Sequence, residues 1–354
     1  THEDLDGIWT DGHDFGDHDG DPDAAAGPCG PHGTHVAGTV AAATDNGLGV
    51  AGVASGVRVL PAKVGTIDPN DATNCLLSGA ALIDALHYVA GAHATLPPPS
   101  TRPAVVNLSL GSAASSFFVE EAVSLVVESG ISVVAATGND DGPVAFPAAH
   151  ASTIAVGAVD HNLDRASYSN FGNEVTVVAP GGDQNRHGTL DAGVLSTVPG
   201  GYAYFQGTSM AAPHVAGLVG LMHSVNRDLR PADVRTLLTS TATDLGITGR
   251  DTWYGYGLID ANAAVVAAQD ALQADAADVI VRIKDGTDVV ATTTARTDGT
   301  YRIESVPMGS FTLEAGTDVD GDGVLGEGGE FHHAEVVNVV YDGDVERHVI
   351  LEPR

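Results

Sequence analysis

The sequence predicts an α/β domain built on a parallel sheet with helices on both faces, followed by a small all-β unit at the C-terminus. Apolar segments alternate with helical ones through most of the 354 residues, which is typical of a parallel sheet. The apolar segments lack a period of two, which indicates strands buried on both faces. After about residue 275 a period of two begins. We therefore expect a first domain over residues 1–274 and a β-sandwich over 275–354.

The first domain is expected to begin irregularly, because residues 1–31 are rich in Asp, Gly, His and Pro. Further on, we expect strands at 57–64, 104–110, 131–136 and 153–159. Small or amphipathic residues at helical spacing predict helices at 32–41, 82–92, 118–129, 209–223, 231–241 and 261–277. The tail shows short strands at 279–283, 301–304, 311–314 and 345–351, separated by Gly, Asp and Pro turns.

The composition narrows the classes of partner. The formal net charge is −31, with two lysines, so nucleic acid and anionic membranes are not expected partners. Such acidity is compatible with divalent cations, with high salt or with solubility alone. No apolar run has the length of a membrane span, and no signal peptide opens the chain.

Two short segments carry the residue types of nucleophilic catalysis. Ser209 stands where a small-residue helix begins, a position that favours developing negative charge. A serine hydroxyl needs an adjacent base, and His32 opens the other small-residue helix. Each residue alone has a plainer interpretation. A serine before a helix is usually an N-cap, and His32 with His35 could form a metal pair.

Five motifs in order along the chain resemble the subtilisin-like serine proteases. Residues 31–39 (Pro-His-Gly-Thr-His-Val-Ala-Gly-Thr) and 207–217 (Gly-Thr-Ser-Met-Ala-Ala-Pro-His-Val-Ala-Gly) are similar to the family's histidine and serine signatures. Residues 134–139, 106–111 and 255–261 resemble its oxyanion-hole segment, substrate-pairing strand and C-terminal helix signature. This similarity covers about residues 1–272. It implies a three-layer subtilisin-like fold and a serine endopeptidase with broad specificity.

The resemblance also implies roles for individual residues. Ser209 would attack the scissile carbonyl, His32 would move the proton, and Asn139 would donate to the oxyanion. The substrate would contact Ser109, Leu110, Gly111 and Gly138 as an added strand. Asp140 and Asp141 would lie near the specificity pocket and mildly favour basic residues, and Ala145 would narrow it.

The family's catalytic aspartate has no counterpart among these residues. It belongs to an Asp-Ser-Gly or Asp-Thr-Gly segment that precedes a stretch resembling residues 2–5 (His-Glu-Asp-Leu). We therefore expect it upstream of residue 1, and expect the chain as given to be nearly inactive, because loss of this aspartate costs about 10⁴ in kcat. The alternative is a catalytically dead scaffold that acts as a calcium-stabilised binding or adhesion protein. A metal hydrolase based on the histidines leaves the serine motif unexplained.

Two loops suggest structural calcium. By resemblance, Asp4, Asp45 and the carbonyls of Ala43, Leu48 and Val50 would hold one ion, although a plain Asn-Gly turn is the alternative. In the tail, residues 318–323 alternate carboxylates and end in Gly, like the start of an EF-type loop. This second set is Asp318, Asp320, Asp322 and, as closing acid, Glu330, with Glu327 as the other candidate. An acidic hairpin tip without an ion is the alternative.

The remaining expectations follow from the resemblance. Cys29 and Cys75 are the two cysteines, and a Cys29–Cys75 disulfide is expected, with two isolated cysteines as the alternative. The tail resembles transthyretin-like or carboxypeptidase-regulatory-like sandwiches, which are accessory modules. We expect a secreted, monomeric protein that acts on proteins or peptides and folds with its own propeptide.

Overall fold

The computed structural model describes residues 2–17, 21–22, 30–68, 70–277, 279–294, 303, 309–317 and 332–339. It divides into two compact units, Thr1–Ala268 and Gln269–Arg354. This division, like the predicted boundary after residue 274, falls within helix α7 (Ala261–Ala277). Among the described residues, no helix has the length and apolar character needed to cross a bilayer.

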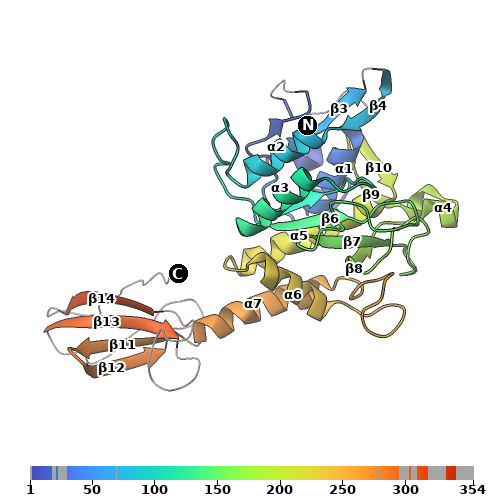
Figure 1. The fold of residues 1–354 in the computed structure, drawn as a ribbon. Coiled ribbons are helices and arrows are strands. Elements are labelled where there is room, and N and C mark those ends of the chain that lie inside the picture. Colours follow the sequence, from blue (N-terminus) through green and yellow to red (C-terminus); the bar gives the residue numbers. More distant parts are fainter. Residues whose placement is uncertain are drawn as a thin grey trace. The chain divides into compact units, whose positions relative to one another are not determined.

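The first unit is organised by a parallel four-stranded sheet (Figure 1). Its strands are β5 (Val105–Leu108), β6 (Ser132–Ala136), β7 (Ile154–Val159) and β8 (Val175–Pro180), which lie side by side in chain order. Val, Ile and Ala fill β6 and β7, and every residue of these two strands is buried. The predicted α/β fold class with a doubly covered sheet is therefore confirmed. Strand β8 was not among the predicted strands.

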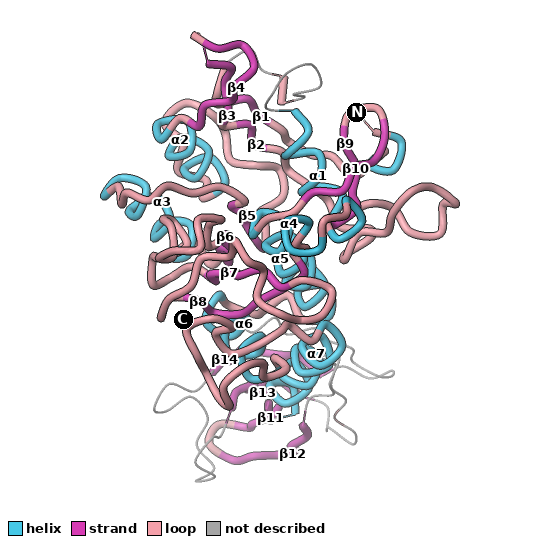
Figure 2. The backbone as a smooth tube through the Cα atoms, turned by 90° about the vertical axis from the view of Figure 1, so that its right-hand side faces the viewer, coloured by secondary structure: helices cyan, strands magenta, loops and turns pink. Residues whose placement is uncertain are grey.

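Helices cover both faces of this sheet (Figures 1 and 2). Helices α2 (Gly79–Val89) and α3 (Phe117–Glu128) pack on one face, while α5 (Thr208–Val225) and α6 (Pro231–Thr241) pack on the other. A hydrophobic core lies on each face of the sheet, and alternate residues of β6 point into the two cores. Val133 and Ala135 face α2 and α3, whereas Val134 and Ala136 face α5 and α6. Helix α1 (Gly30–Ala41) packs against α5.

The segment before α1 is more regular than the sequence predicts. It forms a 3₁₀ turn, η1 (Glu3–Leu5), and a short strand, β1 (His13–Asp14), which pairs in parallel with β2 (Ala62–Lys63). Leu5 is fully buried against α1. Asp14 is ion-paired with Lys63 at 2.8 Å. The expectation of an irregular loop over 1–31 is thus wrong for these residues, because buried side chains anchor them.

Two hairpins and a short helix complete the first unit. The hairpins are β3 (Gly65–Asp68) with β4 (Asp71–Leu77), and β9 (Val194–Val198) with β10 (Gly201–Phe205). Helix α4 (Gln184–His187) and the 3₁₀ turn η2 (Leu190–Ala192) precede β9. Cys75 in β4 is disulfide-bonded. Cys29, the other cysteine of the chain, lies outside the described residues, and the observation on Cys75 is consistent with the expected pairing.

The second unit contains an antiparallel sheet with strand order β12-β11-β13-β14. The strands are β11 (Val279–Asp285), β12 (Asp288–Thr294), β13 (Gly309–Thr317) and β14 (His332–Val339). The predicted all-β character is confirmed, while a sandwich with a second sheet stays a prediction. The strand expected at 301–304, apart from residue 303, and the one at 345–351 lie outside the described residues.

Candidate active site

The carboxyl ends of β5 and β6 form one side of the site. The chain continues from β5 into Ser109, Leu110 and Gly111, and from β6 into Gly138 and Asn139. Neighbouring parallel strands end at the same edge, which is where open α/β sheets place their binding sites. The structure therefore brings together these five residues, which the sequence predicts for substrate and oxyanion binding.

Ser209 reaches this edge from the first turn of α5. The residue before the helix, Gly207, has φ 151°, a conformation that residues with a Cβ rarely adopt. The Ser209 hydroxyl donates to the Ser109 carbonyl oxygen at 3.3 Å, and the Ser109 hydroxyl donates to the Ser209 carbonyl oxygen at 2.8 Å. These two bonds join the nucleophile candidate directly to the predicted substrate-pairing strand.

Asn139 is held by its neighbour in the serine motif. Its Oδ1 accepts hydrogen bonds from the Thr208 backbone N–H at 2.9 Å and from the Thr208 hydroxyl at 3.0 Å. The Thr208 hydroxyl in turn accepts from the Gly138 N–H at 3.0 Å. With Oδ1 occupied in this way, the amide Nδ2 is the donor left to face the cleft. The sequence did not single out Thr208 for this role.

His32 lines the same cleft, which has a volume of about 300 Å³. The other lining residues are Asn139, Gln184, Phe205, Gln206, Ser209 and Met210. Desolvation lowers the pKa of the His32 imidazole below its ordinary value, although the residue is partly exposed to solvent. The imidazole is therefore neutral near pH 7, the form that can accept a proton. Gln184, Phe205 and Gln206 come from segments that no catalytic motif marks, so the sequence analysis missed them.

His35 has a different function from His32. It is fully buried and stacks on Phe205, with ring centroids 4.5 Å apart. Its Nε2 lies 2.9 Å from the Val194 carbonyl oxygen and 3.2 Å from that of Ala203. These contacts tie α1 to β9 and β10. The described residues contain no cluster of three or more His, Cys, Asp or Glu side chains suited to a metal. The His32–His35 pair therefore gains no support as a metal site.

Ala145, which the sequence predicts to narrow the specificity pocket, lies close to the two strand ends. A Cβ built on Gly111 would lie 3.4 Å from the Ala145 methyl carbon, and one built on Gly138 would lie 3.3 Å from it. Ala145 thus packs between these two glycines. Asp141 forms an ion pair with Arg165 at 2.7 Å, so one of the two acids placed near the pocket is already neutralised.

The expected calcium loop folds around Asp4. The buried Asp4 carboxylate accepts from Asn46 Nδ2 at 2.7 Å and from the Val50 N–H at 3.0 Å. Burial by itself raises the pKa of Asp4, but hydrogen bonds from Asn46, Val50 and Tyr202 outweigh it and the net shift is downward. The carboxylate is therefore charged at neutral pH, as a hard cation requires.

The neighbouring residues also pack around Asp4 and Asn46. The Ala43 N–H donates to the Asp4 carbonyl oxygen at 3.0 Å, and the Leu48 N–H donates to Asn46 Oδ1 at 2.9 Å. Asp45 is exposed, and Asn46 reaches the Asp4 carboxylate. The charged Asp4 carboxylate has the chemistry of a calcium ligand, and the carbonyl ligands from Ala43, Leu48 and Val50 stay a prediction. Asp318, Asp320, Asp322 and Glu330 lie outside the described residues.

Comparison with known proteins places the chain in a family. The model of the subtilase family matches residues 1–257. A thermophilic serine proteinase of Bacillus sp. (strain AK1) is 41% identical over 75% of this chain and 58% of its own length. An extracellular protease of Xanthomonas campestris pv. campestris is 39% identical over 80% of this chain and 48% of its own length. The chain spans about half the length of these curated relatives.

A solved structure gives the same assignment. A structure of proteases from Pseudoalteromonas arctica aligns with a TM-score of 0.65 and 36% identity, over 75% of this chain and 86% of the other. The family model covers most of the chain, one relative is a serine proteinase by name, and helices α1 and α5 carry the histidine and serine motifs. The chain therefore belongs to the subtilase family.

Proposed function

We propose that this chain is the catalytic portion of a secreted serine endopeptidase. The observation that carries the proposal is the convergence of Ser209, His32 and Asn139 on one cleft at the carboxyl edge of the sheet. The relative named as an extracellular protease supports secretion. Protein or peptide substrates follow from the same chemistry, and a monomeric enzyme that folds with its own propeptide completes the proposal.

In the proposed reaction, the Ser209 hydroxyl turns from Ser109 toward His32 and attacks the scissile carbonyl carbon. His32 accepts the hydroxyl proton, and the carbonyl oxygen becomes an oxyanion. The Asn139 Nδ2 and the Ser209 backbone N–H donate to that oxygen. One such donor contributes about 2.7–4 kcal/mol to transition-state stabilisation. His32 then protonates the leaving amine, and water repeats the sequence to release the acyl group.

The proposed substrate is an extended peptide that pairs with residues 109–111. Glycine is required at 111 and 138 by the chain's own packing, because an added Cβ would press on Phe146 O at 3.1 Å and on Asn170 Nδ2 at 2.4 Å, respectively. The Ala145 methyl between them limits the depth of the pocket for the residue before the scissile bond. Specificity would otherwise be broad, with a mild preference for basic residues through Asp140.

The third catalytic group is proposed to lie upstream of residue 1. Within the described residues, β5 is an edge strand of the four-stranded sheet, so one of its sides has no partner strand. The buried Asn107 Oδ1 in β5 likewise lacks a hydrogen-bond partner. A preceding strand that carries the aspartate would pair with this edge and orient the His32 imidazole. The proposal also includes a structural calcium ion at Asp4.

The test is peptide hydrolysis by residues 1–354 beside a protein extended upstream, both with calcium. We expect the extended protein to hydrolyse casein-derived peptides about 10⁴ times faster in kcat. Equal, full rates would contradict the upstream aspartate. A folded extended protein without any hydrolysis would support the alternative, a calcium-stabilised binding or adhesion protein on a dead protease scaffold.

A further inference from the structure

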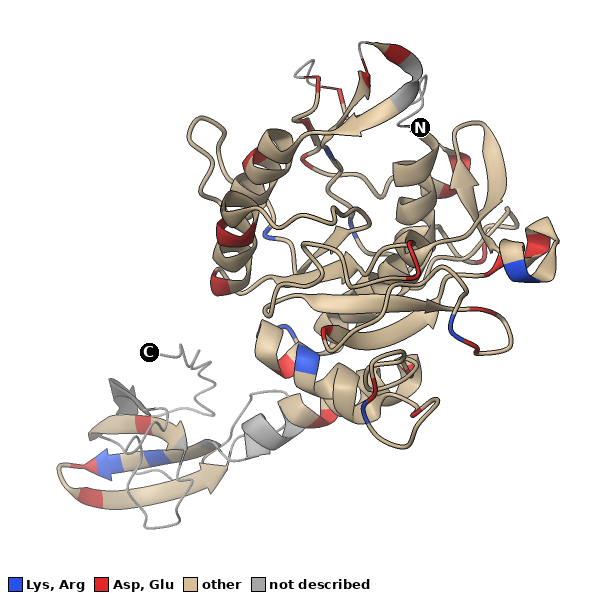
Figure 3. Ribbon diagram, turned by 45° about the vertical axis from the view of Figure 1, so that its right-hand side comes forward, with Lys and Arg blue, Asp and Glu red and all other residues tan. Residues whose placement is uncertain are grey.

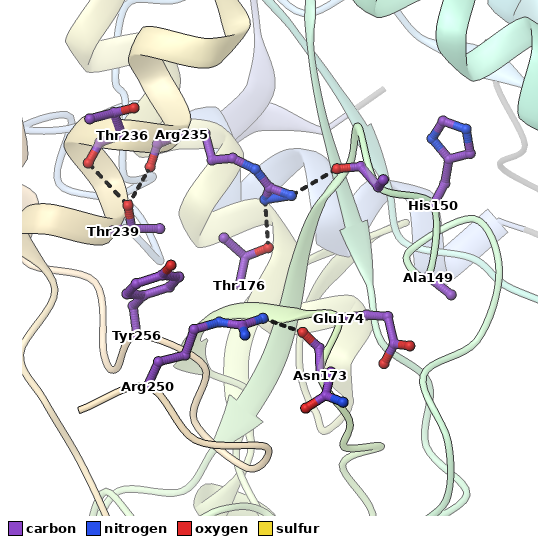
Figure 4. A pocket seen from close by; sticks show the side chains of 11 residues that line it. Ala149, His150, Asn173, Glu174, Thr176, Arg235, Thr236, Thr239, Arg250 and Tyr256 are labelled. Carbon is purple, nitrogen blue, oxygen red and sulfur yellow. Dashed lines mark hydrogen bonds between the residues drawn. The ribbon is translucent and has the colours of Figure 1, made fainter. Parts of the chain in front are cut away.

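A second cavity lies away from the active site (Figure 4). Its volume is about 510 Å³, and it shares no lining residue with the cleft around Ser209. Thr176, near the start of β8, lines it, so it opens at the opposite edge of the sheet from the catalytic residues. Helix α6 contributes Arg235, and the loop after residue 249 contributes Arg250 and Tyr256.

Arg235 is fixed at one side of this cavity. Its guanidinium donates to Thr176 Oγ1 at 2.9 Å and to the carbonyl oxygens of Ala151 and Thr153 at 3.0 Å each. All three acceptors are uncharged, so they orient the guanidinium without neutralising it. Burial lowers the pKa of Arg235 and the nearby Arg250 adds to this shift, while Tyr256 opposes it. The group is therefore a fixed, partly buried cation.

Arg250 provides a second cation on the facing side. Its guanidinium donates to the Asn173 carbonyl oxygen and lies 5.3 Å from the centroid of the Tyr256 ring. In Figure 4 the Arg235 and Arg250 guanidinium groups lie on either side of Thr176. Both head groups therefore present donors toward the same space.

Arg235 and Arg250 differ from the other arginines because one cavity holds both of them. The chain has 46 acidic and 15 basic residues, and three other arginines pair with carboxylates: Arg165, Arg186 and Arg230. Among the described residues, neither Arg235 nor Arg250 has a carboxylate oxygen within 4.0 Å. Glu174 lines the cavity, but its Oε2 is directed toward Gly172. A partly buried and an exposed cation in one cavity, both without such a counter-ion, favour an anionic ligand.

We propose that this cavity binds a small dicarboxylate, with one carboxylate on each arginine. Arg250 uses one of its five donors, on the Asn173 carbonyl oxygen, and keeps the others for a carboxylate. Arg235 already uses both Nη2 hydrogens and one Nη1 hydrogen, so it would hold the second carboxylate through its charge and its remaining donors. The Tyr256 ring and the Thr236 and Thr239 side chains line the space that the carbon chain of the ligand would occupy. The cavity volume lies within the range of small-molecule sites. This site is separate from the proposed protease chemistry.

The test is isothermal titration of the 354-residue chain with succinate, with the uncharged diamide succinamide as the control ligand. Three variants each replace one charged side chain by glutamine. Arg250→Gln removes a cavity cation, Glu174→Gln removes the competing cavity anion, and Arg58→Gln removes an exposed arginine that donates to the Trp9 carbonyl oxygen elsewhere. Arg250 and Glu174 are exposed, so these substitutions leave the fold intact.

We expect succinate to bind and succinamide not to bind. Arg250→Gln should weaken succinate at least 10-fold, in line with the loss of a charge-assisted hydrogen-bond pair. Glu174→Gln should tighten it a few-fold, and Arg58→Gln should leave it unchanged. No succinate binding up to about 10 mM would overturn the proposal. Equal weakening by Arg250→Gln and Arg58→Gln, or phosphate binding as tight as succinate, would also overturn it.

Discussion

Asn139 is the residue whose proposed role in catalysis can be isolated most cleanly. Thr208 fixes its Oδ1, so Nδ2 would be in place for the oxyanion before the proposed reaction begins. We predict that Asn139→Ala lowers kcat about 10²–10³-fold with little change in KM, because the donor acts mainly in the transition state. Steady-state kinetics on the upstream-extended protein measures this. A loss confined to KM would contradict the oxyanion role.

His35 should make stability depend on pH. Burial, offset in part by the carbonyl contacts to Val194 and Ala203, lowers its pKa to about 4. The unfolded chain binds this proton near pH 6.5, so stability from the neutral imidazole is present above 6.5 and is lost as pH falls toward 4. We predict a loss of about 3 kcal/mol in the free energy of unfolding across that window.

Urea denaturation between pH 7 and pH 4 checks this prediction, with His35→Gln as the control. That variant should be less stable at pH 7 and should show a correspondingly flatter dependence on pH. An equally steep dependence in wild type and variant would assign the effect to other groups.

At this scale, the sequence finds the candidate catalytic residues but not the residues that support them. Ser209, His32 and Asn139 stand in contiguous motifs, so the local pattern suffices to find them. The bond from Thr208 to Asn139 joins residues 69 positions apart. Gln184 and Gln206 line the cleft because of how the chain continues after β8 and β10, which no local pattern encodes. In the loop predicted to bind calcium, the sequence did not show that the Asn46 side chain meets Asp4.

Among the elements, the start of α5 carries the sharpest backbone constraint. Gly207 adopts φ 151°, while Gly220 in the same helix has ordinary helical geometry, with the nearest neighbour of an added Cβ 3.5 Å away. We predict that Gly207→Ala destabilises the fold by about 1–3 kcal/mol through backbone strain. Gly220→Ala should be neutral or stabilise by up to about 1 kcal/mol through helix propensity.

Thermal or urea unfolding of the two alanine variants compares these positions directly. Each change adds one methyl group, at the residue before α5 in one variant and inside the helix in the other, so the comparison separates the two backbone conformations. Equal destabilisation by the two substitutions would show that the left-handed backbone at Gly207 is not the cause.

Helices with strong local periodicity were predictable from the sequence, whereas short strands that form only by pairing with another strand were not. Helices α6 and α7 span the predicted 231–241 and 261–277. Strand β1 has two residues among Asp and Gly, and it forms because β2 lies beside it and Leu5 is buried. The β9–β10 hairpin depends on its pairing across 194–205 and on its contact with α1, both of which are tertiary.

For the molecule as a whole, we expect the large net negative charge to affect stability. The net charge is −31, and the ribbon in Figure 3 shows Asp and Glu positions spread over the loops and helices with few Lys and Arg positions between them. Mutual repulsion of like charges destabilises a compact state. Salt screens this repulsion, and the screening length falls to about 3 Å at 1 M salt. We predict that the melting temperature rises between low salt and 1 M NaCl.

Differential scanning calorimetry measures this rise, in a buffer that keeps calcium constant. Choline chloride at the same ionic strength should give a similar rise, because screening does not depend on the identity of the cation. A flat melting temperature in both salts would contradict the repulsion argument.

The central claim is that Ser209 is an activated nucleophile, and one labelling experiment tests it most directly. The upstream-extended protein with calcium would be treated with a fluorophosphonate probe beside its Ser209→Ala variant. We predict labelling of the former and none of the variant. No labelling of a protein shown to be folded, or equal labelling of both, would contradict the assignment of Ser209 as the catalytic serine.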